Sequence, residues 1–119
     1  MKNIVIIDDS QLVLKLTKTA LEHAGYQVTT LVDPGDFEPT VSGTPDLLLV
    51  DINMPEFYGD DVVTYIKEAW NLPTPIFLYS NVSDTELEKA RARCGADGYI
   101  SKEWGLEAMI ASVQAVVGR

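Results

Sequence analysis

Residues 2–10 read Lys-Asn-Ile-Val-Ile-Ile-Asp-Asp-Ser, in which an unbroken apolar run from Ile4 to Ile7 ends in two carboxylates. A run without polar alternation is typical of a strand with both faces buried, as in a parallel sheet covered by helices. Three further apolar runs end in a polar residue, at Asp51, at Ser80 and at Lys102. Because the carboxyl ends of parallel strands share one edge of a sheet, we expect these polar side chains to meet there.

The rest of the chain alternates strand-like and helix-like segments. Strands are predicted at residues 2–7, 27–32, 47–51, 75–79 and 98–101, and apolar residues at helical intervals lie between and after them. The fourth helix is predicted to begin at a capping box, in which Ser83 faces Glu86, and to end at Gly95. This alternation predicts a doubly wound α/β fold with a parallel sheet.

The second of the five expected helices has the weakest pattern. Pro34 suits the start of a helix, but Pro39 follows five residues later. A proline there removes a backbone donor and clashes with the preceding turn. We therefore expect a short or distorted element.

Composition limits the class of protein. A chain of 119 residues corresponds to one domain, and its single cysteine, Cys94, cannot form an internal disulfide. Asp8 and Asp9 interrupt the first apolar run before it could form the core of a signal peptide, and no apolar stretch is long enough to span a bilayer. We expect a soluble, cytoplasmic protein without membrane contact.

The net charge of −9 argues against direct binding of nucleic acid, which requires a clustered positive surface.

The expected cluster of Asp8, Asp9 and Asp51 requires neutralisation. Three carboxylates within a few ångströms repel one another, so that at least one is protonated unless a cation is present. Oxygen ligands with room for water and a phosphate suit Mg²⁺. Asp9 or Ser10 could instead serve only to cap the first helix, but capping explains neither Asp51 nor Lys102.

A carboxylate beside Mg²⁺ can act as a nucleophile toward a phosphoryl group. Lys102 offers a compact cation for one phosphoryl oxygen, and the Ser80 hydroxyl can donate to another. The residues thus match the requirements of a phosphoryl acceptor, in which catalysis rests on positioning and charge neutralisation.

These residues together resemble the receiver domains of two-component response regulators, the family that includes the chemotaxis regulator. The likeness covers essentially the whole chain. It rests on Asp8-Asp9-Ser10, on residues 51–59 (Asp-Ile-Asn-Met-Pro-Glu-Phe-Tyr-Gly), on Ser80, on residues 95–99 (Gly-Ala-Asp-Gly-Tyr), and on Lys102. Each motif is weak alone, but their order and spacing are specific.

The resemblance implies a flavodoxin-like strand order of 2-1-3-4-5 with five helices. It implies that Asp51 accepts the phosphoryl group and, with Asp9, binds Mg²⁺ directly. Asp8 would hold the ion through water, and the backbone carbonyl of Asn53 would complete the protein ligands.

The resemblance also implies an output. Ser80 and Lys102 would contact the phosphoryl oxygens, and the rotamer of Tyr99 would follow the Ser80 hydroxyl. The donor would be a phosphohistidine on a sensor histidine kinase or a phosphotransfer protein. A conformational change would then signal to a downstream effector protein, and a homodimer is plausible by the same likeness.

Three positions near the site attract separate expectations. Receivers often have proline after the lysine, preceded by a cis bond, but Glu103 follows Lys102 here. A trans bond at this point could aim Lys102 differently. Trp104 is expected to pack against the last helix, or alternatively to anchor a partner. Val82 offers no polar group to orient an attacking water, which predicts a comparatively long-lived phosphoryl group.

Two other functions remain open from the sequence. One is a Mg²⁺-dependent phosphohydrolase with a transient aspartyl phosphate, although Asn53 stands where such an enzyme usually has its acid. The other is a receiver-like interaction module that is never phosphorylated. The expected organisation is a single receiver domain over residues 1–119 without an output domain.

Overall fold

The computed structural model describes residues 1–38, 43–54 and 57–118. Pro39, which argues against a long second helix, and Pro55, which belongs to the receiver-like motif, lie outside these ranges. Five parallel strands form one sheet in the order β2-β1-β3-β6-β7, which confirms the predicted order 2-1-3-4-5. The strands are β1 (Asn3–Ile7), β2 (Gln27–Leu31), β3 (Leu47–Val50), β6 (Ile76–Ser80) and β7 (Gly98–Ser101).

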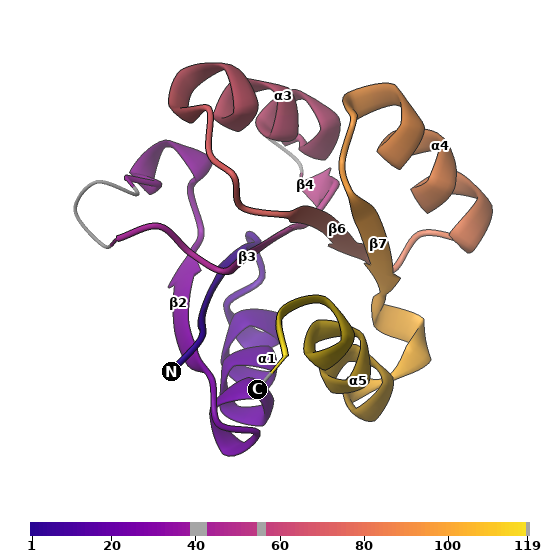
Figure 1. The fold of residues 1–119 in the computed structure, drawn as a ribbon. Coiled ribbons are helices and arrows are strands. Elements are labelled where there is room, and N and C mark those ends of the chain that lie inside the picture. Colours follow the sequence, from indigo (N-terminus) through magenta and orange to yellow (C-terminus); the bar gives the residue numbers. More distant parts are fainter. Residues whose placement is uncertain (39–42, 55–56, 119) are drawn as a thin grey trace.

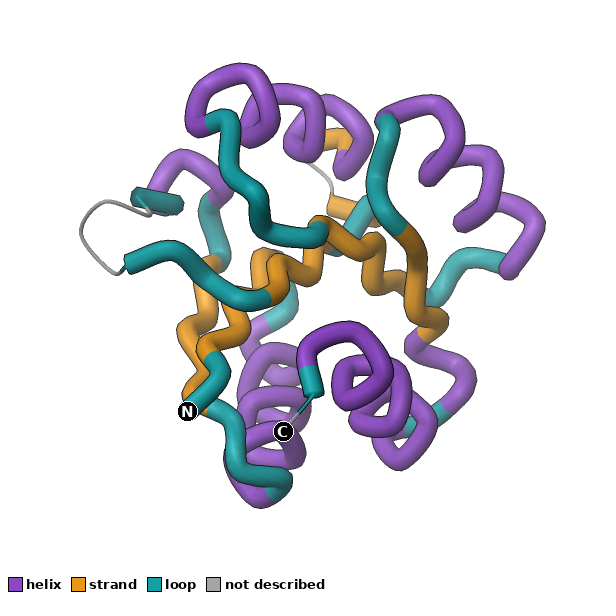
Figure 2. The backbone as a smooth tube through the Cα atoms, in the orientation of Figure 1, coloured by secondary structure: helices purple, strands orange, loops and turns teal. Residues whose placement is uncertain are grey.

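Helices cover both faces of this sheet, as Figure 1 shows. On one face lie α1 (Gln11–His23) and α5 (Leu106–Val117), and on the other lie α3 (Gly59–Trp70) and α4 (Asp84–Cys94). The tube in Figure 2 shows the strands between the two helical layers. All four residues of β3 are buried, as expected for a strand packed on both faces.

The two faces of the sheet carry separate hydrophobic cores. The core beneath α1 and α5 contains Ile6 and Leu49, whereas the core beneath α3 and α4 contains Ile7 and Val50. Neighbouring residues of one strand therefore point to opposite cores, as the two-residue period of a strand requires. The same alternation determines which of the polar side chains at the ends of the strands lie on the same face of the sheet.

The predicted capping of the fourth helix is confirmed. The Ser83 Oγ accepts a hydrogen bond from the Glu86 N–H at 3.2 Å, and Gly95 ends α4 with a φ of 75°. That left-handed conformation favours glycine.

The prediction of five helices was wrong for the described residues, which contain four α-helices. In place of the second helix is a 3₁₀ turn, η1 (Pro34–Asp36). The Asp33 carboxylate accepts from the Gly35 N–H at 2.8 Å and so starts a turn, while Phe37 returns to an extended backbone and is buried. Glu38 precedes a proline, which disfavours helical geometry at that residue.

The structure also contains a small antiparallel pair of strands, β4 (Asn53–Met54) and β5 (Phe57–Tyr58), which the sequence pattern does not predict.

Among the described helices, none combines the length and the apolar character that crossing a bilayer requires.

Candidate functional site

The carboxyl ends of the central strands bring Asp8 and Asp51 together. The Asp8 N–H donates to the Leu31 carbonyl and the Asp51 N–H donates to the Ile7 carbonyl, each at 3.0 Å. Sheet hydrogen bonding thus continues one residue beyond β1 and β3. The backbone of the sheet therefore fixes the position of both aspartates.

Asp8, Asp9 and Asp51 form the acidic cluster that the sequence predicts. Each residue offers one carboxylate oxygen, and these oxygens lie within 4.8 Å of one another. Asp8 and Asp51 are buried, whereas Asp9 is exposed. The cluster therefore has two carboxylates held in the protein and a third that opens to solvent.

Asp8 also shapes the start of α1. Its Oδ1 accepts from the Ser10 N–H at 2.9 Å, and the Ser10 Oγ accepts from the Val13 N–H at 3.3 Å. Ser10 thus caps α1, so the capping alternative holds for this residue. Capping does not account for Asp51, which lies on a different strand and belongs to the acidic cluster.

Lys102 reaches this cluster from the end of β7. Its Nζ lies 2.6 Å from the Asp8 Oδ2 and 3.3 Å from the Asp51 Oδ2. The Lys102–Glu103 bond is trans. The concern that a trans bond would aim Lys102 elsewhere was therefore wrong.

A 3₁₀ turn, η2 (Lys102–Trp104), takes the place of the proline that receivers often have here. The Ser101 Oγ accepts from the Glu103 N–H at 3.2 Å, and Gly105 leaves the turn with a φ of 92°. This local hydrogen bonding and the left-handed glycine let the chain turn so that Lys102 faces the carboxylates.

Burial and charge oppose each other at this ion pair. Burial raises the pKa of Asp8 above its ordinary value, and the Asp51 charge adds to this; hydrogen bonds from Lys102 and Ser10 counteract it without cancelling it. Burial disfavours the charged form of Lys102, but the hydrogen bond to Asp8 and the charges of Asp51 and Asp8 outweigh it and raise its pKa. Lys102 is therefore firmly protonated, whereas the Asp8 charge is held at a cost.

Ser80 is the last residue of β6 and is completely buried. Its Oγ has no hydrogen-bond partner within the described part of the chain. Leaving a buried hydroxyl unpaired costs roughly 1–3 kcal/mol, so native proteins rarely do it without a reason. The hydroxyl is thus available to a group that binds at this edge of the sheet.

Tyr99 and Trp104 lie beside each other near the same edge. Tyr99 is half-buried and packs against the core beneath α3 and α4, the core that also contains Leu78, its partner in β6. The Tyr99 and Trp104 rings are 5.9 Å apart and tilted by 48°. Trp104 is 42% exposed, so a role as a partner anchor stays a prediction.

Two other predicted residues lie close to the site in the chain. Asn53 begins β4, two residues after Asp51, and the role of its carbonyl as a metal ligand stays a prediction. Val82 is half-buried against the core beneath α3 and α4.

Sequence reasoning missed Tyr79. Its ring lies beneath Lys102, with Nζ 5.4 Å from the ring centroid. The available signal was its position directly before Ser80, but an apolar run gives no reason to select one aromatic residue as a site residue.

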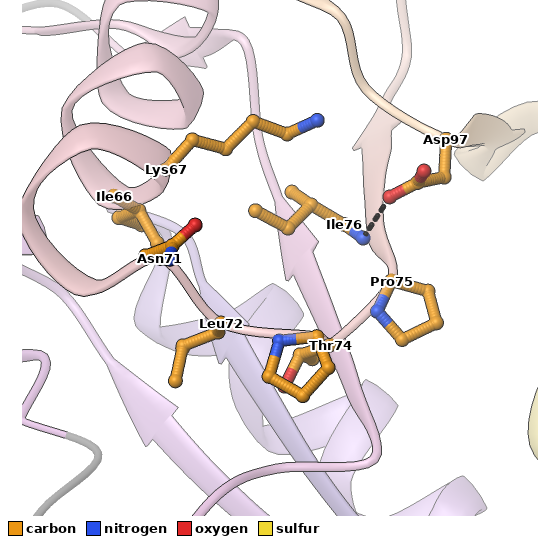
Figure 3. Close-up of a pocket in the computed structure, with 9 residues that line it drawn as sticks. Ile66, Lys67, Asn71, Leu72, Thr74, Pro75, Ile76 and Asp97 are labelled. Carbon is orange, nitrogen blue, oxygen red and sulfur yellow. Dashed lines mark hydrogen bonds between the residues drawn. The ribbon is translucent and has the colours of Figure 1, made fainter.

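A cavity of about 460 Å³ lies at the other end of β6, between the end of α3 and the loop before β7 (Figure 3). Its wall includes Ile76, the first residue of β6, whereas Ser80 is the last; four residues of strand span about 13 Å. The Asp97 carboxylate accepts from the Ile76 N–H, and Lys67 donates to the Gly95 carbonyl. Both charged groups thus already bind backbone, and the candidate chemistry lies at the acidic cluster.

Comparison with known proteins agrees with this geometry. Residues 4–114 match the family model of the response regulator receiver domain. The response regulator ArlR of Staphylococcus saprophyticus is 34% identical over 121 residues, and ArlR of Staphylococcus aureus strain Mu50 is 30% identical over 120. Each alignment covers 100% of this chain and 54% of the relative, so the chain spans about half the length of these curated relatives.

Solved structures show the same fold. The BeF3-activated DrrB receiver domain has a TM-score of 0.81 and 27% identity, with 100% of this chain and 99% of that chain covered. The chemotaxis protein CheY4 of Vibrio cholerae has a TM-score of 0.86 and 24% identity, with 98% of each chain covered, and supports the fold alone. With the match to the family model over residues 4–114, these likenesses show that the chain belongs to the response regulator receiver domain family.

Proposed function

We propose that this receiver domain accepts a phosphoryl group on Asp51 and signals by a change of conformation. The observation that carries the proposal is the position of the Asp51 carboxylate. It lies within 4.8 Å of the ligand oxygens of Asp8 and Asp9 and 3.3 Å from the Lys102 ammonium. A nucleophilic carboxylate, an acidic cluster and a cation thus meet at one point.

In the proposed reaction a carboxylate oxygen of Asp51 attacks the phosphorus of a phosphohistidine on a sensor histidine kinase or phosphotransfer protein. The new bond is an acyl phosphate, and the bond between phosphorus and the imidazole nitrogen breaks. The imidazole leaves with the electron pair and takes up a proton. Lys102 and the unpaired Ser80 hydroxyl would then bind two of the phosphoryl oxygens.

The donor set fits Mg²⁺. All three clustered side chains supply carboxylate oxygens, which suit a small hard cation, and the exposed side of Asp9 leaves room for water and phosphate. Asp9, Asp51 and the Asn53 carbonyl would hold the ion directly, with Asp8 acting through water. When bound, Mg²⁺ would neutralise charge on the transferring group.

The proposed switch uses two residues on one side of the sheet. Tyr99 packs against the core beneath α3 and α4, and Leu78, two residues before Ser80 on β6, belongs to that same core. By the two-residue period of a strand, Ser80 therefore lies on the Tyr99 side of the sheet. Movement of the Ser80 hydroxyl toward a phosphoryl oxygen would open space on that side for the Tyr99 ring to follow.

Several finer proposals follow from family membership. We propose that residues 1–119 form one receiver domain in the cytoplasm, that it catalyses its own dephosphorylation, and that its output passes to an effector protein, with homodimerisation as one route. The net charge of −9 supports an output through protein contact, without direct binding of nucleic acid by these residues. Family membership and Asn53 both disfavour the phosphohydrolase alternative.

Intact mass spectrometry tests the proposal. The protein is incubated with Mg²⁺ and acetyl phosphate, and Asp51→Asn is compared with Asp36→Asn, which removes an exposed carboxylate outside the cluster. We expect one added phosphoryl group in the wild type and in Asp36→Asn, but none in Asp51→Asn. Turnover of the donor without an adduct would favour a hydrolase, and the absence of any reaction would favour a silent interaction module.

A further inference from the structure

Tyr79 occupies an unusual place for a buried tyrosine. It is 3% exposed, and it lies on β6 between Leu78 and Ser80. Its ring belongs to the core beneath α1 and α5, yet the Lys102 Nζ lies 5.4 Å from the ring centroid. This separation is within the range of about 6 Å in which an ammonium is attracted to an aromatic face.

The strand register explains why these groups meet. Leu49 pairs with Phe77 between β3 and β6, so two residues further along the register Asp51 comes beside Tyr79. Tyr79 itself pairs with Ile100 of β7, and Lys102 follows two residues later. Because side chains alternate along a strand, Asp51 and Tyr79 lie on the same face of the sheet. Lys102, two residues after Ile100, leaves β7 on that same face.

Lys102 is turned toward the site by η2, but the partners of its ammonium, Asp8 and Asp51, follow other strands. Its stem has four rotatable carbons, and the residues that follow it, Glu103 to Gly105, are exposed. Asp8 and Asp51 fix its ammonium, but both carboxylates belong to the proposed metal site. Any ion or phosphoryl group that binds there therefore competes with Lys102 for its partners.

The Tyr79 ring is a partner that such binding does not remove. The ring is uncharged and packs in the hydrophobic core beneath α1 and α5. Its face attracts a cation without adding a negative charge to the site. The Tyr79 and Thr17 hydroxyl oxygens are 3.5 Å apart, the long limit of a hydrogen bond. Packing therefore fixes the ring more than its hydroxyl does.

We propose that Tyr79 is a positioning residue for Lys102: its ring keeps the ammonium at the site edge while the carboxylate partners of Lys102 are exchanged for a phosphoryl oxygen. The part of the proposal that concerns the phosphoryl oxygen rests on the proposed function. The contact between the ring and the ammonium does not, so the two can be tested separately.

The first test follows the rate of phosphorylation by acetyl phosphate with Mg²⁺. Tyr79→Leu removes the ring and keeps an apolar side chain, whereas Tyr79→Phe keeps the ring and loses the hydroxyl. We expect Tyr79→Leu to react about 3- to 10-fold more slowly, the size of a modest cation–π interaction, and Tyr79→Phe to stay within about 2-fold of wild type.

A background variant separates positioning from a general loss of structure. In Lys102→Met protein, which keeps the stem and removes the ammonium, we expect Tyr79→Leu to cause no further slowing. A core control is Leu21→Val, because Leu21 is fully buried in the same core but lies near the far end of α1. It should lower stability and leave the rate unchanged.

The second test needs no phosphoryl donor. Nitrogen-15 NMR of lysine side chains measures how fast the Nζ hydrogens of Lys102 exchange with water. Exchange should be several-fold faster in Tyr79→Leu than in wild type, and close to wild type in Tyr79→Phe and Leu21→Val.

The outcomes are distinguishable. Wild-type protein that takes up no phosphoryl group would refute the proposed function, and the NMR comparison would still decide whether Tyr79 holds Lys102. Unchanged exchange in Tyr79→Leu would overturn the inference. Equal slowing by Tyr79→Leu with and without the Lys102 ammonium would also overturn it, because a purely structural effect would not depend on that charge.

Discussion

Replacing Asp8 with asparagine should stabilise the protein in the absence of Mg²⁺. Asp8 is completely buried and belongs to a cluster of three carboxylates, two of which, Asp8 and Asp51, share Lys102. The asparagine side chain would keep a carbonyl oxygen to accept from the Ser10 N–H, and Lys102 would keep Asp51 as its partner. The substitution therefore removes a charge and the Lys102 hydrogen bond to Oδ2, and it keeps the Ser10 hydrogen bond and the Lys102–Asp51 pair.

The expected gain can be worked from the distances. At an effective dielectric constant of about 20, the Lys102–Asp8 pair at 2.6 Å gives an attraction of about 6 kcal/mol, and two carboxylate oxygens no more than 4.8 Å apart repel by at least about 3.5 kcal/mol. Repulsion from Asp51, and a smaller, solvent-screened repulsion from Asp9, therefore offset most of the attraction. Desolvation of the buried carboxylate then decides the balance, and we expect Asp8→Asn to raise the free energy of unfolding by about 1–3 kcal/mol.

The pH dependence has a definite sign. The pKa of Asp8 is raised in the folded protein, so its contribution to stability is fully present below its ordinary pKa and is lost as pH rises through the folded value. Wild type and Asp8→Asn should therefore be similar near pH 3, below the ordinary pKa of an aspartate, and differ more near pH 7. The raised pKa of Lys102 acts only in alkali, where its stabilising charge is lost as pH rises through the folded value.

Urea unfolding followed by tryptophan fluorescence measures the effect, with EDTA present to remove metal. Asp36→Asn, an exposed carboxylate outside the cluster, should change stability by less than about 0.5 kcal/mol. Mg²⁺ should stabilise the wild type and have less effect on Asp8→Asn. Lower stability of Asp8→Asn near pH 7, or an equal difference at both pH values, would refute the electrostatic reasoning.

Three further predictions concern single positions. Val82→Glu should speed dephosphorylation, as measured by decay of the phosphorylated mass, because a carboxylate could orient an attacking water; an unchanged rate would remove the argument. Ser80→Ala should slow phosphorylation while the urea midpoint stays the same or rises slightly, since the lost hydroxyl has no partner among the described residues; a large fall in stability would contradict this. Gly98→Ala should cost about 1–3 kcal/mol, because a Cβ there would lie 2.6 Å from the Phe77 ring, and Phe77→Leu should relieve part of that cost.

The positions of Asp8, Asp51, Ser80 and Lys102 could be predicted because they depend on the sheet. Each residue follows an apolar run, and parallel strands necessarily bring their carboxyl ends to one edge. Spacing along the chain therefore carried enough information to place these side chains at one edge of the sheet. The chemistry of three carboxylates then pointed to a cation without any knowledge of side-chain geometry.

Other features depend on contacts that no periodic pattern encodes. The turn at Pro34 begins where the Asp33 side chain binds the Gly35 N–H, and it ends early because Phe37 enters the core on an extended backbone. The aim of Lys102 depends on the Ser101 hydroxyl, which binds the Glu103 N–H across a turn. Such side-chain hydrogen bonds compete locally with regular structure.

Localising the phosphoryl group tests the central claim most directly. After reaction with acetyl phosphate and Mg²⁺, borohydride reduction converts a phosphorylated aspartate to homoserine, and peptide mass spectrometry then identifies the converted residue. We predict homoserine at position 51 and unchanged aspartate at Asp8 and Asp9. Conversion at another aspartate, or no conversion in protein that carries a phosphoryl adduct, would contradict the assignment of Asp51 as the acceptor.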